Sequence, residues 1–125
     1  MDMYAKYPEL VDKYSDISYP IGWEHILKCL FRQMVWQSQH KHRQDIANQL
    51  INVGDPVKYP VIEQVKEKFG MLRVYVRDTN ARQAGMIVLA EELSGVTCEV
   101  CGSPGTLRNS SWLRTLCDTH HNETT

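Results

Sequence analysis

The chain has 125 residues, of which 42% are apolar, and its 14 basic and 15 acidic side chains give a formal net charge of −1. These values allow one compact core and exclude a uniformly basic nucleic-acid binder. No apolar run approaches the ~20 residues that a membrane-spanning helix needs, and the N-terminal residues MDMYAKYPEL lack the basic and apolar regions of a signal peptide. We therefore expect a cytoplasmic protein without a membrane partner, whose cysteines stay reduced.

Residues 1–20 form a tyrosine-rich N-terminal arm. Pro8 suits the first turn of a short helix that ends near Tyr14. Tyrosine rings bury a large area while the hydroxyl stays in water, so they fit either packing of the arm on the core or a partner surface.

Residues 21–38 are predicted to form a core helix, because apolar residues recur at intervals of three and four. The stripe consists of Trp23, Leu27, Leu30, Phe31, Met34 and Val35. We expect Cys29 to pack there as a small apolar group. The polar run QSQHKHRQ then interrupts the stripe, which resumes at Ile46 and continues to Ile51. Either one long helix has a polar middle, or two helices meet at a turn.

Residues 57–78 are predicted to form a β-hairpin that turns at Phe69-Gly70, since apolar and polar residues alternate on both sides of this pair. In this register Val65 faces Val74 on the core side. Lys66 then faces Arg73, and Gln64 faces Tyr75, on the other side. Glu63 and Glu67 share the inner side, so we expect them at its margins or paired with an arginine.

The outer face of this hairpin is basic, with one interleaved aromatic residue. Such a surface is typical of nucleic-acid platforms, and also of ordinary solvated strands. Together with two arginines near the C-terminal cysteines, it defines our candidate residues for binding nucleic acid or a protein partner: Lys66, Lys68, Arg73, Tyr75, Arg77, Arg108 and Arg114.

A second amphipathic helix is predicted after the hairpin, with Thr79 or Asn80 as its N-cap and Gly95 at its end. Its expected apolar residues are Ala84, Ile87, Val88, Ala90 and Leu93.

The C-terminal quarter carries the strongest motif, in which Cys98-x-x-Cys101 is followed after fifteen residues by Cys117-x-x-His120. This spacing suits one tetrahedral Zn²⁺, because two residues between ligands let a tight turn or a helical turn direct both at one ion. Gly102 supplies the positive φ that such a turn needs. Disulfides are disfavoured, because they would suit a secreted chain.

Two alternatives to this ligand set stay open. His121 also fits, because it lies four residues after Cys117, and spacings of three and of four both place a residue on the same helical face as Cys117. A four-cysteine site with Cys29 in place of the histidine is the other. Between the ligand pairs we expect a turn at Pro104-Gly105 and a short strand at Leu107-Arg108. A terminal helical turn follows at Cys117, and Trp112, Leu113 and Leu116 are expected to cover the metal.

Three segments, VKEKFGMLRVYVR, AEELSGVTCEVCGSPG and WLRTLCDTHH, resemble a family of small, uncharacterised bacteriophage and prophage proteins. The resemblance runs from about residue 22 to residue 121. It implies a phage or prophage origin, hence a bacterial host cell, and metal ligands at Cys98, Cys101, Cys117 and His120. It implies no activity.

We therefore predict an α+β fold: a helix, a β-hairpin, a second helix and a C-terminal treble-clef-like zinc module. Residues 1–97 would form the core with its arm, and residues 98–125 the module packed on it. The expected cofactor is a structural Zn²⁺, with no catalytic residue, because no catalytic motif is present.

The expected function is that of a phage-type accessory protein. It would bind and modulate a host or phage machine, for example as an anti-CRISPR-like inhibitor of a bacterial defence system. Binding of nucleic acid through the basic hairpin face is the first alternative. An HNH-like nuclease is the second, and it needs a metal position that protein ligands do not fill. The sequence predicts no oligomeric state.

Overall fold

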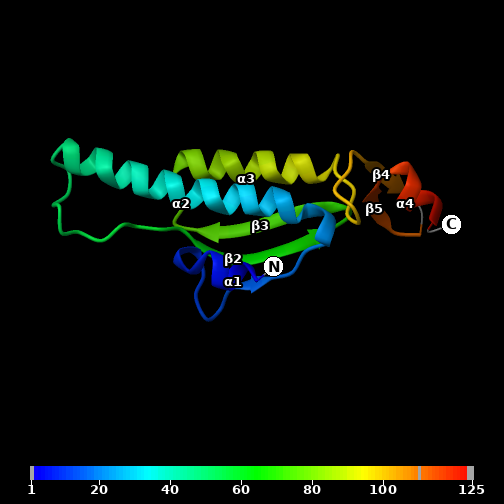
Figure 1. Cartoon of the computed structure of the whole chain (residues 1–125), viewed down its shortest axis with the longest axis horizontal. Coiled ribbons are helices and arrows are strands. Elements are labelled where there is room, and N and C mark those ends of the chain that lie inside the picture. The colour runs from blue at the N-terminus through cyan, green and yellow to red at the C-terminus, as the bar shows by residue number, and fades with distance from the viewer. Residues whose placement is uncertain (1, 110, 124–125) are drawn as a thin grey trace.

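The computed structural model describes residues 2–109 and 111–123; residues 1, 110, 124 and 125, which belong to the predicted arm and metal module, lie outside it. Two long helices run beside a three-stranded sheet, and a small hairpin with the last helix lies at one end of the molecule (Figure 1). The predicted α+β class is confirmed. The helices are α1 (Met3–Lys6), α2 (Glu24–Ala47), α3 (Ala81–Ser94) and α4 (Asp118–Glu123), and the strands are β1 (Asp16–Ile17), β2 (Val61–Lys68), β3 (Met71–Arg77), β4 (Thr106–Asn109) and β5 (Leu113–Leu116).

The N-terminal arm packs largely on the core. Tyr7 is buried and donates a hydrogen bond from its hydroxyl to the carbonyl of Lys28 in α2. The helix expected from Pro8 to near Tyr14 is only a 3-10 turn, Pro8–Leu10, because the chain is already extended at Val11. Tyr14 stays 76% exposed.

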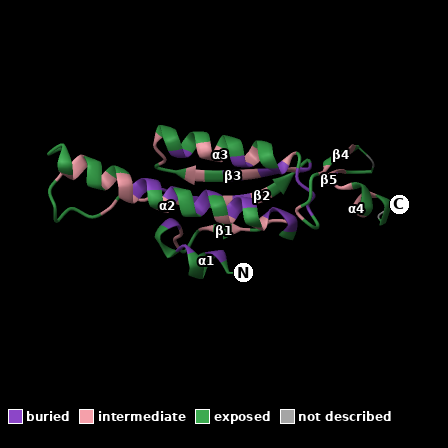
Figure 2. Cartoon of the chain, turned by 45° about the horizontal axis from the view of Figure 1, so that its top comes forward, coloured by how far each residue is buried: buried purple, intermediate pink, exposed green. Residues whose placement is uncertain are grey.

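α2 is one continuous helix through the polar run, which settles the choice between one helix and two. The predicted stripe is confirmed, since Leu27, Leu30, Phe31 and Met34 of α2 are buried and Val35 is half-buried. Trp23 is also buried, but it lies in a 3-10 turn, Ile21–Trp23, so the α-helix begins later than the predicted residue 21. Figure 2 shows these buried positions along α2 and exposed positions over much of α3. Cys29 does not pack in the core, contrary to expectation, because it lies on the exposed side of α2.

α2 ends four residues earlier than the apolar pattern suggests. Gln49 has a φ of 61°, a left-handed conformation that no helix continues through. The N–H of Leu50 then donates to the carbonyl of Asp45, and the N–H of Gln49 to that of Ile46. These two bonds form a Schellman motif, so Leu50 and Ile51 lie beyond the helix.

The predicted hairpin and its register are confirmed. Val65 pairs with Val74, Lys66 with Arg73 and Gln64 with Tyr75. Phe69 and Gly70 both have positive φ, as a two-residue turn between twisted strands requires. β1 adds to the other edge of β2 as a short parallel strand.

A β-bulge changes the position of Glu63. The register shifts between Ile62 and Gln64, so Glu63 has no partner of its own and is exposed. Ile62 takes the inner position opposite Val76. Glu67 keeps its position at the margin of the inner side, where its carboxylate accepts a hydrogen bond from the N–H of Gly70.

α3 begins at the predicted N-cap. Asn80 accepts a hydrogen bond from the N–H of Gln83, and the side chain of Gln83 accepts one from the N–H of Asn80. This reciprocal pair is a capping box. Of its expected apolar residues, Ala90 is buried and Ile87 half-buried, whereas Ala84, Val88 and Leu93 are exposed, contrary to expectation. No helix in the described part of the chain combines the length and apolar character that crossing a bilayer requires.

Candidate metal centre

The first two cysteines lie on a tight turn that follows α3. Gly102 has a φ of 81°, and its N–H donates to the carbonyl of Cys98. The N–H of Cys98 in turn donates to the carbonyl of Ser103. The turn therefore directs the side chains of Cys98 and Cys101 to the same side, as the spacing predicted.

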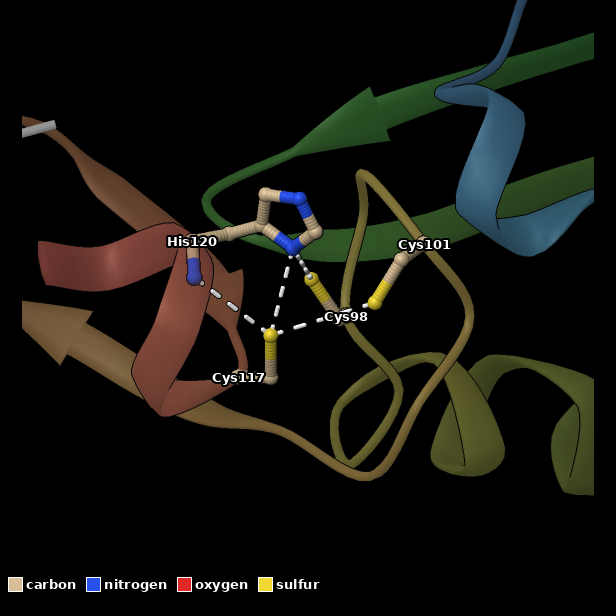
Figure 3. A group of neighbouring side chains, drawn as sticks. All are labelled: Cys98, Cys101, Cys117 and His120. Carbon is tan, nitrogen blue, oxygen red and sulfur yellow. Dashed lines mark hydrogen bonds between the residues drawn. The ribbon is translucent and has the colours of Figure 1, made fainter. Parts of the chain in front are cut away.

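The third and fourth residues come from the end of β5 and the first turn of α4. Cys117 lies between the two elements, and His120 lies one helical turn later (Figure 3). Arg108 holds this junction in place, because its guanidinium donates to the carbonyl of Leu116 and to the carboxylate of Asp118 at 2.8 Å.

The four side chains converge on one point. The sulfur of Cys98, the sulfurs of Cys101 and Cys117 and a ring nitrogen of His120 all lie within 4.8 Å of one another. The Cys101 and Cys117 sulfurs are 3.8 Å apart, and Nδ1 of His120 is 3.2 Å from Cys117 and 3.7 Å from Cys98. Tetrahedral Zn²⁺ with Zn–S bonds of about 2.3 Å has neighbouring sulfurs roughly 3.8 Å apart. The cluster thus has the size of a tetrahedral metal site.

The structure selects His120 over His121, which the spacing left open. Nδ1 of His120 lies in the cluster, and its Nε2 is 3.9 Å from the carboxylate of Glu123. His121 contributes no atom to the group of four, and neither does Cys29.

Thiol acidity differs within the cluster. Burial by itself would raise the pKa of the Cys98 thiol. Hydrogen bonds from the backbone N–H groups of Cys117, Cys101 and Val100 have the larger combined effect and lower this pKa to about 6. At Cys117 the N–H of His120 lowers the pKa, whereas desolvation and the neighbouring cysteines raise it above its usual value. One thiolate therefore makes the next harder to form, and a bound cation removes this repulsion.

Two hydrogen bonds fasten the backbone beside the cluster to the 3-10 turn Ile21–Trp23, which directly precedes α2. The N–H of Gly22 donates to the carbonyl of Glu99 at 2.7 Å, and the indole N–H of Trp23 donates to the carbonyl of Thr97 at 2.9 Å. A Cβ at position 22 would lie 2.1 Å from the carbonyl oxygen of Cys98. Gly22 carries no sequence signal as part of this site, because only a long-range contact gives this glycine its role.

A second attachment joins the cluster to the tip of the large hairpin. The hydroxyl of Thr115 donates to the carbonyl of Gly70 at 2.6 Å. Glu99 is buried beside it, where its carboxylate accepts the N–H of Thr115 at 2.7 Å and lies 3.6 Å from Arg114. Burial raises the pKa of Glu99, against the lowering effect of these two partners.

Several predicted partner-binding residues are engaged within the chain. Arg77 forms an ion pair with Asp12 at 2.9 Å, Arg108 with Asp118, and Arg114 with Glu99. Lys66, Lys68, Arg73 and Tyr75 lie on the outer face of the sheet as predicted. The amine of Lys66 is 5.8 Å from the ring centre of Tyr75.

Trp112 does not cover the cluster, contrary to expectation, because it is 71% exposed. It lines a cleft of about 820 Å³ between the hairpin tip and β5, together with Phe69, Lys68 and Arg114. Leu116 is buried and Leu113 half-buried.

Comparison of the chain with models of protein families, with curated proteins and with solved structures found no match.

Proposed function

We propose that the cluster binds one structural Zn²⁺ and that the chain acts as a small binding protein. The observation that carries this proposal is the closed donor set of three sulfurs and one imidazole nitrogen, all within 4.8 Å. Sulfur and imidazole donors suit Zn²⁺ among the common divalent ions. Four protein ligands leave no position for substrate, which is the pattern of structural sites and weighs against the nuclease alternative. The order of turn, hairpin and helix is that of a treble clef.

The metal part of this proposal is tested by elemental analysis of Cys98→Ser, Cys117→Ser and Cys29→Ser. Cys29 is the matched control, because it is exposed and lies outside the cluster. We expect one zinc per chain in the parent and in Cys29→Ser, and less than half of that in the other two. Equal zinc content in all four proteins would contradict the ligand set, and its absence from the parent would contradict the site.

The proposed role is to bind and modulate a host or phage macromolecular machine in a bacterial cell, with inhibition of a defence system as the example. Support comes from the resemblance of three sequence segments to small phage proteins and from large side chains left in solvent. Phe69 and Trp112 are 66% and 71% exposed on the same cleft. Exposed aromatic residues of this kind are typical anchors of protein interfaces.

A pull-down from bacterial lysate at physiological salt tests this role. A specific partner should be retained by the parent and by Tyr14→Ser, whose ring is exposed but lies outside the cleft. It should be lost with Trp112→Ser. Recovery of no specific protein would count against the role.

Nucleic-acid binding is the second candidate, because Tyr75 is 45% exposed between lysines and Arg73 on the outer face of the sheet. Phosphate contacts would give an affinity that falls steeply with salt. A mobility-shift series across salt concentrations separates this candidate from the first.

A further inference from the structure

The outward face of α3 is unusually apolar for a helix in solvent. Of its fourteen residues only Arg82, Glu91 and Glu92 are charged. Val88, Leu89 and Leu93 are 60%, 61% and 43% exposed. Exposed apolar residues gathered on one face are typical of an interaction site.

One seam on this face has the spacing of helix-to-helix contacts. Arg82, Gly85, Leu89 and Glu92 follow one another at intervals of three, four and three, and all four are exposed. Such a repeat keeps residues on one side of a helix, where they can meet a partner helix. A Cβ placed on Gly85 would meet nothing within 4 Å, so no part of the described chain fills the space above it.

The seam is complementary to itself when reversed. Arg82 and Glu92 lie five residues on either side of Ile87, and Gly85 and Leu89 lie two residues on either side. In an antiparallel pair centred on Ile87, each arginine therefore faces a glutamate. Leu89 of each copy faces Gly85 of the other, and the glycine leaves room for the leucine because it has no side chain. Because a two-fold axis relates the two copies, each of these contacts occurs twice in the dimer.

We propose that α3 is the contact helix of a homodimer, in which two copies pack antiparallel through this seam. The charge pairs fix the direction and register, and Leu89 of each copy fills the space over Gly85 of the other. This inference uses no metal ligand and does not depend on the proposed function.

Charge reversal tests the pairing by sedimentation velocity over a concentration series of the full chain. The parent should form dimers at micromolar concentration. Arg82→Glu and Glu92→Arg should each raise the dimer Kd roughly tenfold, because each reversal turns two attractive pairs into repulsive ones. Neither change should impair folding, since both place charges favourably with respect to the helix dipole.

Mixing the two variants is the decisive experiment, because in the mixed dimer every glutamate of the seam again faces an arginine. Neither variant should dimerise well alone, while the mixture should recover the parent Kd. Arg43→Glu, an exposed reversal on α2, is the matched control and should change nothing. A parent that stays monomeric at every concentration overturns the proposal and leaves this face to a partner of different sequence. A dimer whose affinity the mixture does not restore overturns the antiparallel register.

Gly85→Leu provides an independent check. Leucine favours the helix more than glycine does, so the monomer should melt no lower than the parent. Because the new side chain would meet Leu89 of the other copy, dimerisation should nevertheless weaken. Unchanged dimerisation would contradict the seam.

Discussion

Gly22 lies directly against the backbone of Cys98 and Glu99, in the loop that carries the first two cysteines of the cluster. A Cβ there would meet the carbonyl of Cys98 at 2.1 Å and that of Glu99 at 2.6 Å, and neither neighbour is a flexible side chain. We expect Gly22→Ala to lower the free energy of unfolding by about 1–3 kcal/mol, the usual cost of overpacking. Urea unfolding measures this. Gly54→Ala is the control, because its Cβ would meet nothing within 4 Å; equal stability of the two variants would contradict the close contact.

Single substitutions at His120 and His121 test which histidine is the fourth metal ligand. We expect His120→Ala to weaken zinc binding more than about a hundredfold, because loss of an outer-shell partner alone costs 10–100-fold. His121→Ala should stay within a few-fold of the parent, since His121 is outside the cluster. Competition with a chromophoric chelator gives both affinities. The opposite order would reassign the fourth ligand.

The sequence predicts the four side chains of the candidate metal site, but spacing alone leaves His121 open as an alternative to His120. Offsets of three and four residues from Cys117 both suit a shared ion, and only the orientation of α4 decides between the two histidines. Arg108 contributes to that orientation by binding the carbonyl of Leu116 and the carboxylate of Asp118. No local pattern predicts such a contact, and the same holds for Gly22.

Among the elements, the hairpin was predicted in detail because two independent signals agree. Alternation sets the inner face, and the turn at Phe69-Gly70 sets the register. α3 was predicted less well, because polar residues take its inner positions. Gln83 is buried and donates to the carbonyl of Met34 and the hydroxyl of Ser38. Hydrogen bonds of this kind let polar groups displace apolar ones from the core.

The N-terminal arm and the sheet are joined by the ion pair of Asp12 and Arg77. The hydrogen bond from Arg77 is the main reason that the pKa of Asp12 lies below its usual value. The pair therefore stabilises the fold at neutral pH, and this contribution is lost as the pH falls below about 4 through the folded-state pKa. NMR titration should show the low pKa of Asp12 and its return to the usual value in Arg77→Gln. An unshifted Asp12 in the parent would show that the arm is not held there.

At the scale of the whole molecule, the region around the cluster has little core of its own. Within residues 98–109 and 111–123, the buried side chains are those of Cys98, Glu99, Thr115 and Leu116. We expect a region with so few buried groups to depend on a bound metal ion for folding. The large core is built instead from α2, α3, the hairpin and the N-terminal arm.

Metal removal should therefore unfold one end of the molecule and leave the other. After chelation we expect amide protection to be lost from residues 98–109 and 111–123, while β2, β3 and α2 remain protected. The indole resonance of Trp23 should shift, because its N–H bonds to the carbonyl of Thr97 next to the cluster. Hydrogen exchange followed by mass spectrometry measures the first effect, and NMR the second. Protection that is unchanged after complete metal removal would refute the structural role of the ion, whereas restored protection on adding Zn²⁺ back would tie the loss to the metal itself.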